Sequence, residues 1–207
     1  MENPTKLYLV RHGEVEEKYH CIYGGRIDMS LSDLGQRQAA ALGEFFQRLK
    51  PDAIYCSSMK RALQTLEPIR EGWSKEPVIL DDLREIDFGE WTGLEWDEVA
   101  RRHDAEVFDW LSLLDSGEVD GAESTDELRA RLEPCLNRIT EAHEAQSVVI
   151  VCHGAVIRSL LSILLDMPLD RLGALDVSYA SVTKVDWSPK RAVARYINHT
   201  PWNSEPS

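Results

Sequence analysis

The sequence of 207 residues lacks the features of membrane and disulfide-rich proteins. No apolar run approaches the roughly 18 residues that a membrane span needs. The N-terminal segment 1–6, Met-Glu-Asn-Pro-Thr-Lys, has neither the basic nor the apolar region of a signal peptide. The cysteines at positions 21, 56, 135 and 152 show no Cys-x-x-Cys spacing, so neither a disulfide framework nor a metal site is indicated. We therefore expect a cytoplasmic protein without membrane contact.

Basic residues are also scarce. The chain has 23 lysines and arginines against 36 aspartates and glutamates, a formal net charge of −13. Nucleic acids and anionic membranes are polyanions that such a surface repels, so we expect neither as a partner. A small anionic substrate stays open, because it responds to nearby arginines more than to a distant, salt-screened surface.

Short apolar runs alternate with amphipathic segments through most of the chain. Strands are predicted over 6–10, 53–56, 78–80, 147–152, 181–187 and 192–197, and helices follow caps at Ser32, Ser57-Ser58 and Ser124, at 94–115 and after 153. This alternation predicts an α/β fold, a three-layer sandwich with a mostly parallel central sheet flanked by helices. Residues 1–207 are predicted to form one domain, with 85–122 as a cap over the site and 198–207 as a loose tail.

Ligands of such sheets bind beyond the carboxyl ends of the strands. The ends of the first four predicted strands deliver ionisable side chains in turn: Arg11 and His12, then Arg61, then Glu85, then His153. Arginine is planar, permanently charged and bidentate toward phosphate. A neutral imidazole is a competent nucleophile, and a carboxylic acid can protonate a leaving alkoxide. The set therefore predicts phosphoryl transfer with His12 as the nucleophile, and it requires no metal ion or cofactor.

The same residues stand in segments that resemble the motifs of the histidine phosphatase superfamily, the phosphoglycerate mutase-like enzymes. The matching segments, in the family's order, are Leu9-Val10-Arg11-His12-Gly13-Glu14, residues 31–39, 57–65 and 83–93, and Val151-Cys152-His153-Gly154. The resemblance spans residues 6 to about 160. A lone Arg-His-Gly triplet is weak evidence, whereas several motifs in order are specific.

The resemblance implies a role for each matching position. His12 would be phosphorylated, Arg11, Arg61 and His153 would form the phosphate pocket, and Glu85 would be the proton donor. The backbone N–H of Gly154 would also reach the phosphate. One departure concerns Lys18, which stands where many family members carry an asparagine and would either contact the phosphate or point into solvent.

Other residues keep two interpretations. Trp91, Trp96, Phe108 and Trp110 would shape a substrate pocket or pack the cap onto the sheet. Arg26 and Arg84 would be secondary anion contacts or salt-bridge partners. Histidines 20, 103, 143 and 199 fall in no motif and are predicted to be structural, and the acidic neighbours of Glu85 (Asp81, Asp82, Asp87 and Glu90) are predicted to be solvated.

The resemblance favours a phosphatase acting on a small phosphorylated metabolite, similar to small cofactor-independent phosphatases such as α-ribazole phosphatase. The length and the segment 88–93, Phe-Gly-Glu-Trp-Thr-Gly, motivate this choice. A phosphoglycerate mutase is the alternative enzyme. A catalytically silent protein that binds a phosphorylated ligand is a third hypothesis. The sequence leaves the natural substrate and a homodimer open.

Overall fold

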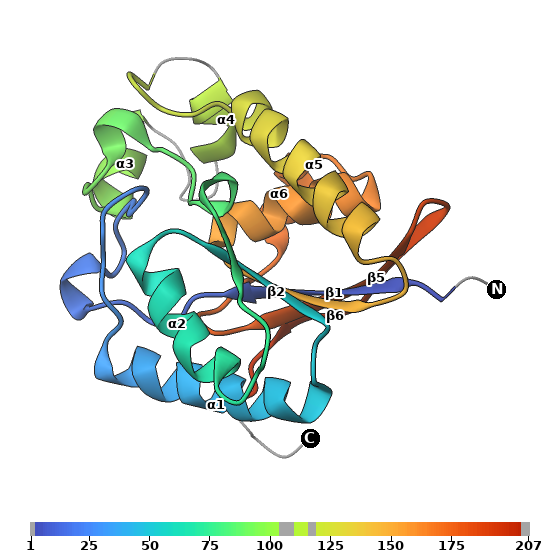
Figure 1. The fold of residues 1–207 in the computed structure, drawn as a ribbon. Helices are drawn as coiled ribbons and strands as arrows, with labels where there is room; N and C mark the ends of the chain where they lie inside the picture. The colour runs from blue at the N-terminus through green and yellow to red at the C-terminus, as the bar shows by residue number, and fades with distance from the viewer. Residues whose placement is uncertain (1–2, 104–109, 116–118, 204–207) are drawn as a thin grey trace.

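A six-stranded mixed sheet lies at the centre of the molecule (Figure 1). The structure is a computed structural model, and it describes residues 3–103, 110–115 and 119–203. The sheet order is β3-β2-β4-β1-β5-β6, in which β3, β2, β4 and β1 are parallel and β5 and β6 are antiparallel to their neighbours. The strands are β1 (Thr5–Arg11), β2 (Ala53–Ser57), β3 (Val78–Leu80), β4 (Ser147–Cys152), β5 (Val182–Ser188) and β6 (Arg191–His199).

Helices cover both faces of this sheet, as the sequence predicts. In Figure 1, α1 and α2 lie below it and α5 and α6 above it. The helices are α1 (Asp33–Leu49), α2 (Lys60–Arg70), α3 (Trp96–His103), α4 (Trp110–Asp115), α5 (Thr125–Ala142) and α6 (Gly154–Leu165). Short 3₁₀ turns occupy Glu17–Tyr19, Asp81–Leu83, Gly89–Trp91 and Leu169–Ala174. The three-layer α/β arrangement is confirmed.

The core continues on both sides of the sheet because its middle strands are apolar on both faces. In β1, Leu7 and Leu9 pack against α5 and α6, whereas Tyr8 and Val10 pack against α1 and α2. Residues 148–152 of β4 are all fully buried. A parallel strand covered on both faces is expected to be a continuous apolar run, and the predicted central position of 147–152 is confirmed.

Helix caps explain two of the predicted helix starts, and the third prediction is wrong. Ser32 caps α1 by accepting a 3.0 Å hydrogen bond from the N–H of Gly35, and Ser124 forms the predicted capping box with Glu127. Ser57-Ser58 does not cap α2, which begins after Met59 without a side-chain cap. The Ser57 hydroxyl is used elsewhere, in the site described below.

The C-terminal segment is more ordered than the predicted tail. Strand β6 continues to His199, and Trp202 packs against the core on the α1 side. The indole N–H of Trp202 donates a 3.0 Å hydrogen bond to the carbonyl of Tyr179. Residues 198–203 therefore belong to the fold, and 204–207 lie outside the described residues. In the described part of the chain, no helix is long and apolar enough to cross a membrane.

Candidate active site

His12 follows β1 directly, and its backbone is fixed on both sides. Its N–H donates to the carbonyl of Cys152 at 3.1 Å, and its own carbonyl accepts a 3.0 Å hydrogen bond from the N–H of Ala180. The next residue is glycine because α1 approaches the loop closely: a Cβ on Gly13 would lie 2.6 Å from the carbonyl oxygen of Gly35. The backbone thus places the His12 ring, which is buried, at the carboxyl edge of the sheet.

Hydrogen bonds determine which imidazole nitrogen of His12 is reactive. Nδ1 lies 2.8 Å from the carbonyl oxygen of Gly13, and since a carbonyl only accepts, Nδ1 carries the hydrogen. The lone pair of the neutral ring is then on Nε2. The Nε–H of Arg61 donates to this Nε2 at 3.1 Å. Nε2 is therefore the basic nitrogen of the neutral ring.

His153, at the start of α6, faces the same arginine. Its Nδ1 accepts from the Nε–H of Arg61 at 3.2 Å, and its Nε2 lies 2.8 Å from the hydroxyl of Ser57, to which it donates. The His12 and His153 ring centroids are 5.1 Å apart. One N–H group thus joins both imidazoles, and the predicted convergence of these residues is observed.

Arg61, in the first turn of α2, is 2% exposed, and its guanidinium also organises a loop. Nη1 donates to the carbonyl of Ile27 and Nη2 to the carbonyl of Gly25, each at 2.9 Å. Gly25 has a φ of +44°, which favours glycine. Only the forked guanidinium of arginine can donate at once to the two imidazoles and to these two carbonyls.

Burial and positive charge keep both histidines neutral. Burial, followed by the charges of Arg61 and Arg11, lowers the pKa of His12 well below its usual range. Burial, followed by Arg61, His12 and Arg11, does the same for the pKa of His153. Burial also lowers the pKa of Arg61 to about 10, so that this residue stays cationic at neutral pH. In the free pocket the arginines therefore supply the positive charge, and His153 adds none.

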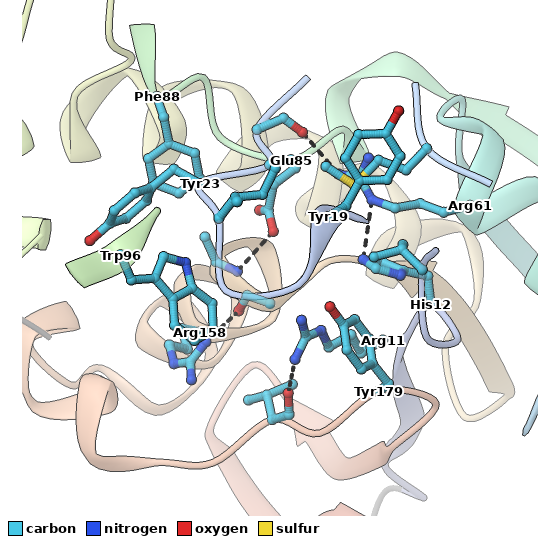
Figure 2. A pocket seen from close by; sticks show the side chains of 18 of the residues that line it. Arg11, His12, Tyr19, Tyr23, Arg61, Glu85, Phe88, Trp96, Arg158 and Tyr179 are labelled. Atoms are coloured by element: carbon cyan, nitrogen blue, oxygen red, sulfur yellow. Dashed lines mark hydrogen bonds between the residues drawn. The ribbon is translucent and has the colours of Figure 1, made fainter. Parts of the chain in front are cut away.

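Arg11 is positioned by a carbonyl and an aromatic ring. Its Nη1 donates to the carbonyl of Val177 at 2.6 Å, and its guanidinium carbon lies 4.0 Å from the centroid of the Tyr179 ring (Figure 2). Within the described residues, the buried Nε of Arg11 finds no hydrogen-bond partner. An unsatisfied buried donor is costly unless a ligand accepts from it, which suits an anion in this pocket.

Glu85 lies in the loop after β3 and points into the same cavity (Figure 2). Its Oε1 accepts from the N–H of Ile86 at 3.1 Å, and its Oε2 is 3.5 Å from the N–H of Ala155, at the start of α6. The carboxyl group is half-buried, and the observed contacts orient it toward the first turn of α6. It therefore shares the cavity wall with His12 and Arg11.

An ion pair outside the cavity stabilises the loop that carries Glu85. Arg131 on α5 forms a salt bridge with Glu123, and both side chains are about one-tenth exposed. Arg131 also donates to the carbonyls of Asp82 and Glu85. Burial alone would raise the pKa of Glu123, but the hydrogen bond and charge of Arg131 outweigh it and the pKa is lowered. The position of Glu85 thus depends on a charge pair outside the cavity.

Arg11, His12, Arg61 and Glu85 line one cavity of about 330 Å³, whereas the fully buried His153 lies behind Arg61 and is not among the lining residues. Its polar lining is Arg11, His12, Arg61, Glu85, Gly154, Arg158 and Asp176, and its aromatic lining is Tyr19, Tyr23, Phe88, Trp96, Trp110 and Tyr179. Ligand pockets usually measure about 300–1,000 Å³. The cavity therefore suits a small phosphorylated molecule with an apolar portion.

Lys18 does not line this cavity. Its Nζ lies 3.3 Å from Oε1 of Glu16 and 4.9 Å from the ring centroid of Tyr19, and the side chain is 62% exposed. The structure therefore shows the solvent-facing alternative. The secondary candidates Arg26 and Arg84 form ion pairs with Asp87 and Asp81, respectively.

The aromatic residues of the predicted cap divide between the two interpretations. Trp96 and Trp110 line the cavity, together with Phe88, whereas Trp91 is buried in the core. Phe108 lies outside the described residues, as do other parts of the predicted cap at 104–109 and 116–118.

Sequence reasoning missed Tyr179 and Arg158. Tyr179 belongs to the segment before β5, which no matched motif covers, and its contact with Arg11 depends on the antiparallel pairing of β5 with β1. Arg158 could have been found, because it stands one helical turn after Gly154 on a predicted helix. In the described ranges no cluster of three histidine, cysteine or acidic side chains could hold a metal ion.

Comparisons with known proteins agree with this fold. A model of the histidine phosphatase superfamily (branch 1) matches residues 7–200. Phosphoserine phosphatase 1 of Hydrogenobacter thermophilus is 31% identical over 196 residues, which cover 95% of this chain and 93% of that protein. The α-ribazole phosphatase of Shigella flexneri shares the fold, with a TM-score of 0.81, 24% identity and coverage of 95% and 97%. A phosphoserine phosphatase mutant from Entamoeba histolytica, in complex with phosphoserine, gives a TM-score of 0.81 at 25% identity, with coverage of 96% and 99%.

Proposed function

The chain belongs to the histidine phosphatase superfamily and is a phosphatase, and on this basis we propose that it hydrolyses a small phosphomonoester through a covalent phosphohistidine on His12. The observation that carries the proposal is the neutral His12 ring, whose Nε2 lone pair lies beside Arg61 in the cavity that Arg11 and Glu85 also line. A nucleophile, two permanent cations and a carboxyl group are the parts that phosphoryl transfer needs.

In the first step, Nε2 of His12 attacks phosphorus and the bond from phosphorus to the ester oxygen breaks. Arg11 and Arg61 bind the equatorial oxygens, and the Nε–H of Arg61 moves its hydrogen bond from His12 to a phosphoryl oxygen. Glu85 gives its proton to the departing alkoxide, so the alcohol leaves neutral. His153, held by Ser57, borders the phosphoryl group and gains affinity for a proton when the dianion binds.

In the second step, the Glu85 carboxylate takes a proton from water as the water oxygen attacks phosphorus. The bond between phosphorus and Nε2 of His12 breaks, the electron pair returns to nitrogen, and orthophosphate leaves. The enzyme is restored with Glu85 protonated. No step uses a metal ion, so we propose a metal-independent reaction. A cytoplasmic location and a homodimer stay predictions.

Hydrolysis of p-nitrophenyl phosphate in the presence and absence of EDTA tests this proposal. We expect equal rates in both conditions. Absence of hydrolysis, or its loss on chelation, would contradict the proposal. With 3-phosphoglycerate, release of orthophosphate faster than formation of 2-phosphoglycerate separates the phosphatase from the mutase alternative. A screen that includes phosphoserine and α-ribazole 5′-phosphate then addresses the substrate.

A further inference from the structure

Arg158 brings a third guanidinium to the cavity wall. It stands on α6, one turn after Gly154, and is half-buried. Its Nη1 donates to the carbonyl of Gly154 at 3.2 Å and its Nη2 to the carbonyl of Leu175 at 2.9 Å. These two bonds fix the plane of the guanidinium. A Cβ on Gly154 would lie 3.4 Å from Nη1 of Arg158 and 3.8 Å from Nε of Arg11, so both arginines border the same point of the wall.

This guanidinium has unused N–H donors and, in the described ranges, no carboxylate within ion-pair distance. Arginine has five N–H donors, and two are used by the carbonyls, which leaves three. Across the described ranges, no carboxylate forms an ion pair with Arg158. The two acidic residues of the cavity have other partners: Asp176 accepts from Ser178 and Asn198, and Glu85 accepts from backbone N–H groups.

A half-buried cation without an anion is unfavourable unless something offsets the cost. Burial, followed by the charge of Arg11, lowers the pKa of Arg158, and the charges of Glu85 and Asp176 offset this only in part. Other half-buried arginines outside the cavity have acidic partners, as Arg131 has in Glu123. The charge of Arg158 is therefore best explained by an anion that enters with the substrate.

The position of Arg158 separates it from the reacting atoms. In Figure 2, Arg158 lies on one side of the cavity and His12 on the other, with Glu85 and Arg11 between them. A substrate with its phosphoryl group at His12 and its ester oxygen near Glu85 therefore extends toward Arg158. Trp96 also lines the cavity and offers an apolar surface to the carbon skeleton of the substrate.

We propose that Arg158 binds a second anionic group, a carboxylate or another phosphate, carried by the alcohol portion of the substrate. The inference rests on the proposed phosphatase reaction and adds the class of phosphomonoester. Arg158 selects the substrate through its three free N–H donors, and takes no part in the transfer of the phosphoryl group. A bidentate arginine contact favours such an anion over a neutral group.

Two matched substrate pairs test the inference. O-Phosphoserine differs from O-phosphoethanolamine by the carboxylate, and the bisphosphate of propane-1,3-diol differs from the monophosphate by the second phosphate. The measurement is the ratio of kcat/KM within each pair. For at least one pair we expect wild type to favour the anionic member by about 10- to 100-fold, the range of charge-assisted hydrogen bonds. The preferred pair identifies the anion.

Variants assign the preference to Arg158. Arg158→Met should bring the ratio close to one, and Arg158→Lys should keep part of it. The matched control is Arg48→Met, because Arg48 is an exposed arginine on α1 outside the cavity lining, and its ratio should equal that of wild type. Thermal unfolding of each variant establishes that the fold is retained.

Three results would overturn the inference. Equal kcat/KM within both pairs for wild type would do so without any variant. A preference that survives in folded Arg158→Met would place the anion elsewhere. An equal fall for both members of a pair would assign Arg158 to the phosphoryl group. Hydrolysis of p-nitrophenyl phosphate by wild type distinguishes these results from failure of the proposed function, in which no substrate reacts.

Discussion

The Nε–H of Arg61 donates a 3.1 Å hydrogen bond to Nε2 of His12, the atom proposed to attack phosphorus. The same N–H lies 3.2 Å from Nδ1 of His153. In the free protein this N–H is hydrogen-bonded to the lone pair that is proposed to attack phosphorus. A phosphoryl oxygen of the substrate must therefore accept this N–H in place of His12. We therefore predict that substrate binding frees Nε2 of His12 and transfers the hydrogen bond of the cationic Arg61 to the phosphoryl group.

Replacing Arg61 tests this exchange. Arg61→Lys keeps the charge but cannot contact His12, Ile27 and Gly25 together, so we expect kcat/KM to fall by about 100-fold or more, as for loss of a transition-state donor. Arg61→Met should also lower the free energy of unfolding by about 1–3 kcal/mol, because buried acceptors lose their donor. Lys60→Met, at the exposed neighbouring position, is the control. An Arg61→Lys variant within twofold of wild type would contradict the assignment.

The lowered pKa values of His12 and His153 predict a spectroscopic signature. Two histidine ring signals in NMR spectra should keep the neutral form from pH 8 down to about pH 5.5, a range in which an ordinary histidine with a pKa near 6.5 becomes protonated. His12→Asn and His153→Asn assign the two signals. Orthophosphate should raise at least one of these pKa values, because a bound dianion favours the imidazolium. Ordinary titration of every ring would contradict the electrostatics.

The same shifts predict how stability depends on pH. A lowered pKa means that the unfolded chain binds more protons than the folded one below about pH 6.5, so stability is present above that pH and lost as the pH falls toward the folded pKa. The loss is about 1.4 kcal/mol per pH unit for each histidine within this window. Urea unfolding at pH 7.5 and pH 5.5 should show a smaller loss in His153→Asn than in wild type. Equal losses would contradict the shift.

Tyr179 is predicted to act by positioning Arg11. Tyr179→Phe keeps the ring that lies 4.0 Å from the guanidinium carbon, and we expect kcat/KM close to that of wild type. Tyr179→Leu removes the cation–π contact and should lower kcat/KM by about 5- to 30-fold. Inhibition by orthophosphate should weaken in parallel, because Arg11 is proposed to bind the phosphoryl group. A Leu variant with normal phosphate affinity would rule out the positioning role.

The salt bridge between Arg131 and Glu123 is predicted to stabilise the loop that carries Glu85. Arg131→Met should lower the free energy of unfolding by about 2–3 kcal/mol and reduce kcat, since the carbonyls of Asp82 and Glu85 lose a donor. Arg129→Met is the matched control on the same helix, because its pair with Glu133 is exposed and contributes about 0.5 kcal/mol or less. Equal effects of the two substitutions would contradict the prediction.

Much of the site was predictable because local patterns determine it. Apolar runs at 6–10, 53–56 and 147–152 predict parallel strands, and the carboxyl ends of parallel strands meet at one edge. His12, Arg61 and His153 follow from that geometry. Glycine after His12 also has a physical reason, the close approach of α1.

The remainder depends on tertiary contacts that sequence periodicity does not encode. Tyr179 reaches Arg11 only because β5 pairs antiparallel with β1. Trp91 and Trp96 are similar in sequence context, yet one packs in the core and the other lines the cavity. Lys18 could contact phosphate or Glu16 by sequence alone, and the structure shows Glu16. The predicted tail was wrong because Trp202 and β6 bury apolar surface together.

Trapping the phosphorylated enzyme tests the central claim most directly. Wild type and His12→Asn are mixed with ³²P-labelled p-nitrophenyl phosphate, quenched rapidly in alkali, digested and analysed by mass spectrometry. The account predicts an acid-labile, alkali-stable phosphoryl group on His12 in wild type, formed at least as fast as turnover, and none in His12→Asn. Turnover by wild type without label on His12, or a competent label on another residue, would contradict the account.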